Sequence, residues 1–79
     1  MSKTKHLSTT ERLALPAADV AKMLGISERH LWALNSSGRL PLPLRFGRAV
    51  RWNLAELQNW LDAGGPARDQ WEAEKGAPP

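Results

Sequence analysis

Five arginines lie within residues 27–52, and Glu28 is the one acidic residue of that stretch. Residues 53–79 have the opposite balance, with five acidic and two basic residues. An arginine side chain presents a planar fork of N–H donors that fits a phosphate group or a guanine edge with two hydrogen bonds. The arginine-rich stretch therefore predicts an anionic partner such as nucleic acid, and a solvated basic surface is the alternative.

The candidate contact residues form two groups within this stretch. The first group lies on an expected helix, where four residues from Arg29 to Ser36 have the i, i+3, i+4, i+7 spacing of one helical face. The second group consists of three arginines on both sides of Gly47. The residues that we predict to contact DNA are Ser27, Arg29, His30, Trp32, Ala33, Ser36, Arg45, Arg48 and Arg51.

Several of these residues also have a purely structural interpretation. Trp32 points away from the apolar side of its own helix, so it lies against DNA or packs under the hairpin or the C-terminal tail. His30 contacts a base or serves as a hydrogen-bonding or packing residue. Glu28 offsets the helix dipole or accepts from a cytosine amino group. Arg51 contacts DNA or pairs with an acid such as Glu56.

Two short helices with a tight turn between them are expected to position the first group. Apolar residues at i, i+3, i+4 and i+7 predict a helix over 17–24, with Gly25 as its stop. Ser27 is a favourable N-cap for a second helix over about 28–36, which ends at Gly38. Two helices joined by a glycine-containing turn indicate a helix-turn-helix, a pattern that other helical hairpins share.

A β-hairpin is expected to position the second group. The runs 42–46 and 50–52 flank residues 47–49, which we interpret as a three-residue loop. In this register the apolar residues of both strands share one face, and Arg45 lies opposite Arg51 on the other. A two-residue turn would mix apolar and charged residues, so the pattern favours the longer loop. Like charges directly opposite each other destabilise the free protein, which again suggests an anionic partner.

A third helix and a tail complete the chain. Asn53 and Glu56 have the spacing of an N-cap and a capping-box glutamate. The helix ends at Gly64-Gly65-Pro66, and residues 67–75, which include Trp71, could form one or two frayed helical turns. The inward stripe of the third helix is Leu54, Leu57, Trp60 and Leu61.

The expected fold class is mainly α with a small β-hairpin, a winged helix-turn-helix of three helices plus a wing. Residues 1–12 form a flexible N-terminal segment, and residues 13–64 form the DNA-binding domain, which opens with a short strand over 13–15. Residues 65–79 form an acidic tail that is partly helical or disordered.

Length and composition narrow the classes of function. A chain of 79 residues without cysteine has a small core and no thiolate chemistry, which argues against an enzyme with a deep, dry pocket. His30 has only the distant His6 as a histidine partner, so we expect no metal site. No apolar run approaches the roughly 20 residues of a membrane span. We expect a cytoplasmic, non-enzymatic protein without a cofactor.

Four motifs follow one another at a recognisable spacing. They are LPAADVAKMLGISERHLW at 15–32, SGRLP at 37–41, RFGR at 45–48 followed by RW at 51–52, and LQNWL at 57–61. This order resembles the AlpA/excisionase-like branch of the MerR-type winged helix-turn-helix proteins, over about 50 of the 79 residues.

The resemblance implies roles for individual residues. In that family the second helix is the recognition helix and the hairpin is the wing, which implies that Arg29, His30 and Trp32 face the major groove or its backbone. It also implies that Arg48 lies on the wing. The chain departs from the family at Glu28, where relatives often have a basic residue, so no base preference is implied. The dimerising coiled coil and effector domain of full MerR regulators are absent, so no ligand sensing is implied.

The leading functional hypothesis is sequence-specific binding of double-stranded DNA. The resemblance implies a small transcription regulator of phage or mobile-element type, or an excisionase that acts as a recombination directionality factor, with integrase or RNA polymerase as a protein partner. We expect a monomer or a weak dimer that makes no contact with membranes and is cooperative on DNA. The alternative is an accessory adaptor, such as a small terminase or integrase-recruiting subunit, that contacts its partner through Trp71 and the acidic tail.

Overall fold

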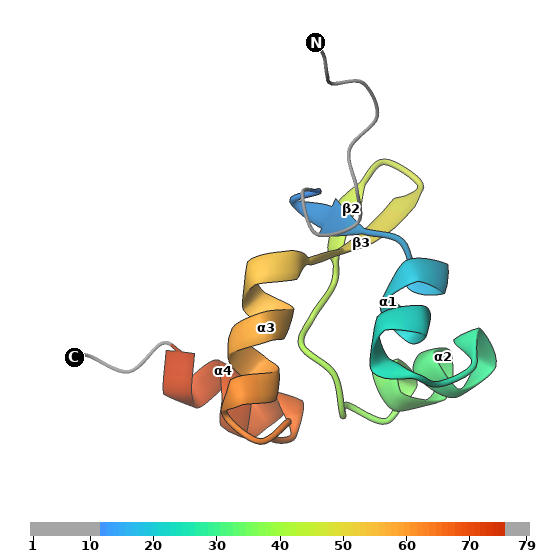
Figure 1. The fold of residues 1–79 in the computed structure, drawn as a ribbon. Coiled ribbons are helices and arrows are strands. Elements are labelled where there is room, and N and C mark those ends of the chain that lie inside the picture. Colours follow the sequence, from blue (N-terminus) through green and yellow to red (C-terminus); the bar gives the residue numbers. More distant parts are fainter. Residues whose placement is uncertain (1–11, 76–79) are drawn as a thin grey trace, which may run out of the picture.

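The computed structural model describes residues 12–75, so the N-terminal segment expected to be flexible lies outside the described residues except for Arg12. The described part forms four helices and a three-stranded antiparallel sheet of order β1-β3-β2 (Figure 1). None of these helices is long and apolar enough to cross a membrane. The elements are β1 (Ala14–Leu15), α1 (Ala17–Leu24), α2 (Glu28–Ser36), β2 (Leu44–Phe46), β3 (Ala49–Asn53), α3 (Leu54–Asp62) and α4 (Arg68–Lys75).

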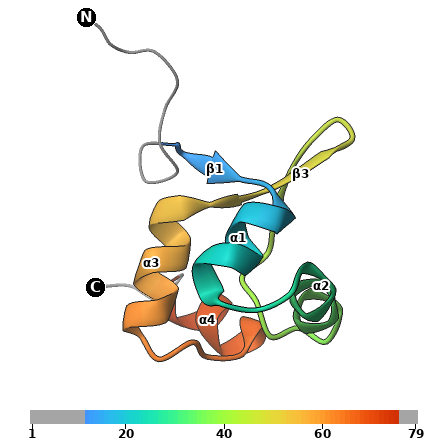
Figure 2. The same ribbon diagram turned by 45° about the vertical axis from the view of Figure 1, so that its right-hand side comes forward.

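The segment that joins α2 to β2, residues 37–43, runs between two pairs of helices. Helices α1 and α2 lie on one side of this linker, and α3 and α4 lie on the other (Figure 1). The β2–β3 hairpin extends beyond the helices on the side where α2 lies (Figure 2). The expected fold class, mainly α with a small β-hairpin, is confirmed, and the arrangement is consistent with a winged helix-turn-helix.

The turn between α1 and α2 forms as the local sequence predicts. Gly25 adopts the left-handed conformation at φ 74°, and the N–H of Ile26 donates to the carbonyl of Ala21 at 3.0 Å, which closes the end of α1. The Ser27 hydroxyl accepts from the backbone N–H of His30 at 3.0 Å, as an N-cap does. Both helices have the predicted bounds.

The predicted register of the hairpin is wrong. Phe46 pairs with Ala49, and Arg45 pairs with Val50 rather than Arg51, so the loop has two residues instead of three. Gly47 has a φ of 65°, the left-handed value that glycine adopts at the first position of a type II′ turn. The three-residue loop would instead place the left-handed conformation at its last position, where alanine is strained. Turn geometry therefore sets the register.

One hydrophobic core joins every helix to β1, β3 and the linker. Its buried members are Leu15, Ala17, Val20, Ala21, Leu31, Leu40, Trp52, Leu54, Leu57, Trp60 and Trp71. The prediction for the third helix is wrong at Leu61, which is 50% exposed. Trp60, which precedes it, is buried as predicted, and the loop after α3 covers it. Gly65 lies against the indole, and the Pro66 carbonyl accepts from Trp60 Nε1 at 2.8 Å.

Glu56 joins α4 to α3 rather than completing a capping box. The Asn53 side chain accepts from the backbone N–H of Glu56 at 2.9 Å, as predicted. The Glu56 carboxylate, however, accepts from Trp71 Nε1 at 2.9 Å and forms an ion pair with Lys75. The alternative pairing of Arg51 with Glu56 is also wrong, because Arg51 Nη1 donates to the Val50 carbonyl at 2.9 Å. The predicted frayed turns are therefore a helix that contributes Trp71 to the core.

The burial of Trp71 predicts that α4 stabilises the whole domain. Trp71→Ala should lower the free energy of unfolding by about 3–5 kcal/mol, the usual cost of removing a buried tryptophan, which is comparable to the total stability of so small a domain. Urea unfolding followed by far-UV circular dichroism measures this change. Gln70→Ala, at an exposed position of the same helix, is the matched control and should change stability by less than about 0.5 kcal/mol. Equal urea midpoints for the two variants would contradict a core role of Trp71.

The Lys75 ion pair predicts a loss of stability in alkali. The hydrogen bond to Glu56 is the main cause that raises the pKa of Lys75 above its ordinary value of 10.5. A raised pKa means that the folded state holds the proton more tightly than the unfolded state. The ion pair therefore contributes to the free energy of unfolding below the ordinary pKa, and this contribution is lost as the pH rises through the raised pKa. Lys75→Met should therefore be less stable than wild type at about pH 8 to 9, and the difference should disappear as the pH rises through the raised pKa of Lys75. Urea midpoints measure both, and a difference that persists in strong alkali would exclude the ion pair as its cause.

Candidate nucleic-acid interface

The outward face of α2 carries most of the predicted contact residues. Leu31 is fully buried and Leu34 is half-buried, which fixes the side of α2 that faces the core. Arg29, Ala33 and Ser36 are exposed. At about 100° per residue, these three positions lie on the side opposite Leu31. The helical spacing in the sequence therefore places the first group correctly on the surface of α2.

Trp32 lies at the edge of this face and contacts the wing. Its ring makes an edge-on contact with Trp52 of β3, with ring centroids 5.6 Å apart and an interplanar angle of 61°. The alternative that Trp32 packs under the hairpin is thus correct for one side of the indole, yet the residue remains 39% exposed. The other three tryptophans are at most 8% exposed, and each donates its Nε1–H to an oxygen of the fold. Trp32 Nε1 has no hydrogen-bond partner within residues 12–75.

Ser27 and His30 lie at the N-terminal end of α2. Both are exposed, and the Ser27 hydroxyl is occupied as the N-cap of the helix. His30 and Trp32 are about 160° apart around the helix axis, so they occupy opposite flanks. The interface that α2 shares with the wing therefore lies on the Trp32 flank, and His30 borders it from the other side.

The corrected register separates the wing arginines. Residues that pair directly across an antiparallel ladder lie on the same face, so Arg45 shares the face of Val50 and, two residues further, of Trp52. This is the face that Trp32 contacts. Arg51 lies on the opposite face beside Leu44, so the predicted like-charge pair does not form. Arg48 is exposed in the two-residue turn at the tip.

The charges of the domain are segregated. The ion pairs within residues 12–75 join Arg12 to Asp19 and Lys75 to Glu56 and Glu72, and none of them involves a residue of α2 or of the β2–β3 hairpin. The arginines of α2 and the wing form no ion pair within the described range, and the acids of the C-terminal third lie on α3 and α4. The exposed side of α2 and the wing is therefore positive, as an anionic partner requires.

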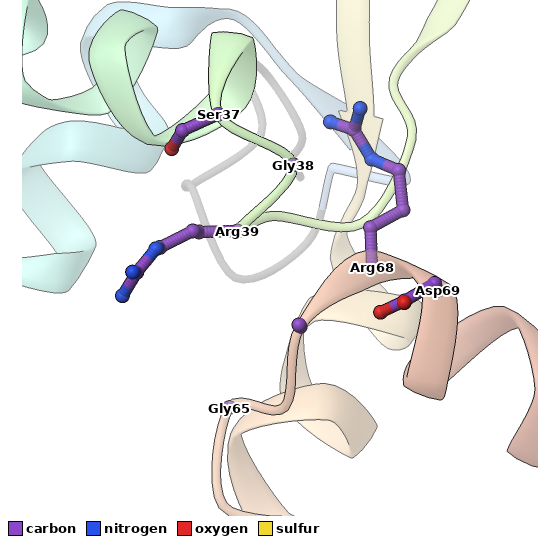
Figure 3. Close-up of a pocket in the computed structure, with 7 residues that line it drawn as sticks. Ser37, Gly38, Arg39, Gly65, Arg68 and Asp69 are labelled. Atoms are coloured by element: carbon purple, nitrogen blue, oxygen red, sulfur yellow. The ribbon is translucent and has the colours of Figure 1, made fainter.

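A cleft of about 750 Å³ lies on another part of the domain, between the end of α2 and the start of α4 (Figure 3). Arg39 extends from the linker at one side of this cleft, and Arg68 points toward the linker at the other. The cleft residues are Ser37, Gly38, Arg39, Gly65, Ala67, Arg68 and Asp69. No pattern in the sequence indicated a role for Arg68, because the atoms that bind it lie about 30 residues earlier.

No set of three or more metal-ligating side chains gathers anywhere in residues 12–75. The chemistry that this surface offers is hydrogen bonding by guanidinium groups and apolar contact by Trp32 and Ala33. Both are suited to the edges and backbone of a duplex.

Comparison with known proteins agrees with this geometry. No curated protein and no solved structure shows significant similarity to the chain. The family model described as a helix-turn-helix domain matches residues 15–65, which run from the end of β1 through the loop after α3. The match covers more than half of the chain and includes α1, the turn, α2 and the hairpin. The chain therefore belongs to the helix-turn-helix domain family and is a small DNA-binding protein.

Proposed function

We propose that the protein binds double-stranded DNA with α2 in the major groove and the β2–β3 wing against the backbone or the adjacent minor groove. The observation that carries this proposal is the contact between Trp32 and Trp52, which fixes the exposed face of α2 beside the Arg45 face of the wing. Helix α2 has nine residues and is about 14 Å long, and the major groove is about 12 Å wide.

The proposed contacts on α2 follow from side-chain size and charge. Ala33 and Ser36 are small, so the helix can approach the groove floor closely at these positions. Arg29 reaches a guanine edge or a phosphate. The exposed part of Trp32 lies against a deoxyribose or an apolar base edge. Ser27 and His30 lie at the positive end of the helix dipole, where a phosphate is favoured.

The proposed contacts of the wing differ between its two faces. Arg45 faces the α2 side and contacts a phosphate of the strand that separates the two grooves. Arg48 projects from the tip into the minor groove, where the negative potential attracts arginine. Arg51 lies on the far face and is held by the Val50 carbonyl, so it adds positive potential rather than a direct contact. The protein carries out no chemistry on the DNA.

The biological role that we propose is transcription regulation or recombination control in a phage or mobile element. A footprint over a promoter supports regulation. Tandem footprints beside an integrase core site, or an adjacent integrase gene, support an excisionase. The adaptor alternative loses its main residue, because Trp71 is 8% exposed and belongs to the core. Deletion of residues 66–79 would also remove Trp71 from the core, so it would not test the adaptor alternative separately from stability.

DNA binding should be strongly salt-dependent. If three to five phosphates are neutralised, log Kd should rise with log salt with a slope of roughly 3 to 4.5. Arg45→Ala and Arg48→Ala should each weaken binding to all duplexes and lower that slope by about 0.9 for each phosphate that the variant no longer neutralises. Arg39→Ala, which removes the same charge from the cleft, is the control and should leave the slope unchanged. Fluorescence anisotropy at several salt concentrations measures the slopes, and a flat response in the wild type would exclude the proposal.

DNA should shield Trp32 from a neutral quencher. Because Trp32 is the most exposed of the four tryptophans, it accounts for most quenching by acrylamide in the free protein. A saturating duplex should lower the Stern–Volmer constant of the wild type. The constant of Trp32→Phe should be low with and without DNA, since the remaining indoles are buried. Unchanged quenching of the wild type on saturation would place Trp32 outside the interface.

A further inference from the structure

The C-terminal end of α2 lacks a cation of its own, and α4 supplies one. The last turn of α2 contains no basic residue. A helix C-terminus carries partial negative charge and several carbonyls without partners inside the helix. Arg68 Nη2 donates to the backbone carbonyl of Asn35 at 3.1 Å and to Asn35 Oδ1 at 2.7 Å. The guanidinium therefore compensates the charge at the end of α2.

Arg68 also holds the linker that follows α2. Its Nε donates to the Leu40 carbonyl at 2.8 Å, and its backbone N–H donates to the Gly38 carbonyl at 2.9 Å. Further along the linker, the Pro41 carbonyl accepts from Trp52 Nε1 at 3.1 Å. The linker is thus fixed by α4 at Gly38 and Leu40 and by the wing strand at Pro41.

We infer that Arg68 is a positioning residue for DNA recognition, which sets the direction of α2 relative to the wing. Its fork bridges the last turn of α2 and the linker, and Trp52 ties the same linker to β3. Groove readout depends on the relative placement of helix and wing, because base-edge hydrogen bonds require a fixed geometry. Helix α4 lies beyond the residues that match the family model, so the hydrogen bonds of Arg68 come from outside the matched region. The inference rests on the proposed function.

The test compares sequence-specific with non-specific binding. The wild-type chain is first used to select a preferred duplex from a random library. The measured quantity is then the ratio of Kd for an unrelated duplex to Kd for the selected duplex. Non-specific binding arises from phosphate contacts, so a misplaced recognition helix lowers the ratio while non-specific affinity is largely kept. Failure to select any duplex defeats the proposed function itself, before any variant is made.

Arg68→Ala should lower this ratio by at least about fivefold, the loss expected for one good base contact. Asn35→Ala removes the side-chain acceptor from α2 and should lower the ratio as well. The double variant should lose no more than Arg68→Ala alone, because that change already removes the hydrogen bond that Asn35→Ala breaks. Arg68→Lys keeps the charge at the end of α2 but not the fork, so it should recover part of the ratio. Arg39→Ala removes a charge from the same cleft and should leave the ratio unchanged.

All variants are compared where circular dichroism shows them fully folded, so that stability does not enter the ratio. Asn35→Ala and Arg68→Lys keep the inference testable if Arg68→Ala does not fold. A ratio within twofold of wild type in these folded variants, or additive losses in the double variant, overturns the positioning role while leaving DNA binding intact.

Discussion

The burial of Trp52 is the interaction on which the rest of the domain depends. Trp52 has no exposed surface, and its indole N–H donates to the Pro41 carbonyl. The polar edge of the ring is therefore buried with its hydrogen bond made. The same side chain lies beside Leu15 across the ladder to β1 and receives the edge of Trp32 from α2. One residue therefore ties β1, α2 and the linker to β3.

The parts of the fold that were predictable are those specified within a few residues. The bounds of α1 and α2 follow from helical spacing, the left-handed Gly25 and the Ser27 cap, which are local constraints that act whatever the rest of the chain does. The predicted hairpin register was wrong because it required the apolar residues of β2 and β3 to share one face. In the structure Leu15 of β1 is the apolar residue that pairs with Trp52, and Leu44 of β2 pairs with Arg51 instead.

The surface positions of the candidate contact residues could be predicted where they depend on local spacing. The helical period placed Arg29, Ala33 and Ser36 on the exposed face of α2 without knowledge of the partner elements. The assignment of Arg51 to the interface depended on the register and moved to the other face with it. Arg68 could not be found, because its acceptors on Asn35 and Leu40 are separated from it by about 30 residues and follow only from the packing of α4.

Small size explains why structural and recognition roles overlap in this domain. In so small a domain nearly every element contributes to the one core, so a helix that presents an exposed face also carries core residues. Trp32 illustrates the result: one edge contacts Trp52 and stabilises the angle between α2 and the wing, while the exposed remainder is available to a duplex. Arg68 acts at the C-terminal end of α2, where it donates to the carbonyls of Asn35 and Leu40 and so joins the helix to the linker. Trp52 therefore holds α2 along its Trp32 flank and Arg68 holds its C-terminal end, so the packing of the fold sets the placement of α2 beside the hairpin.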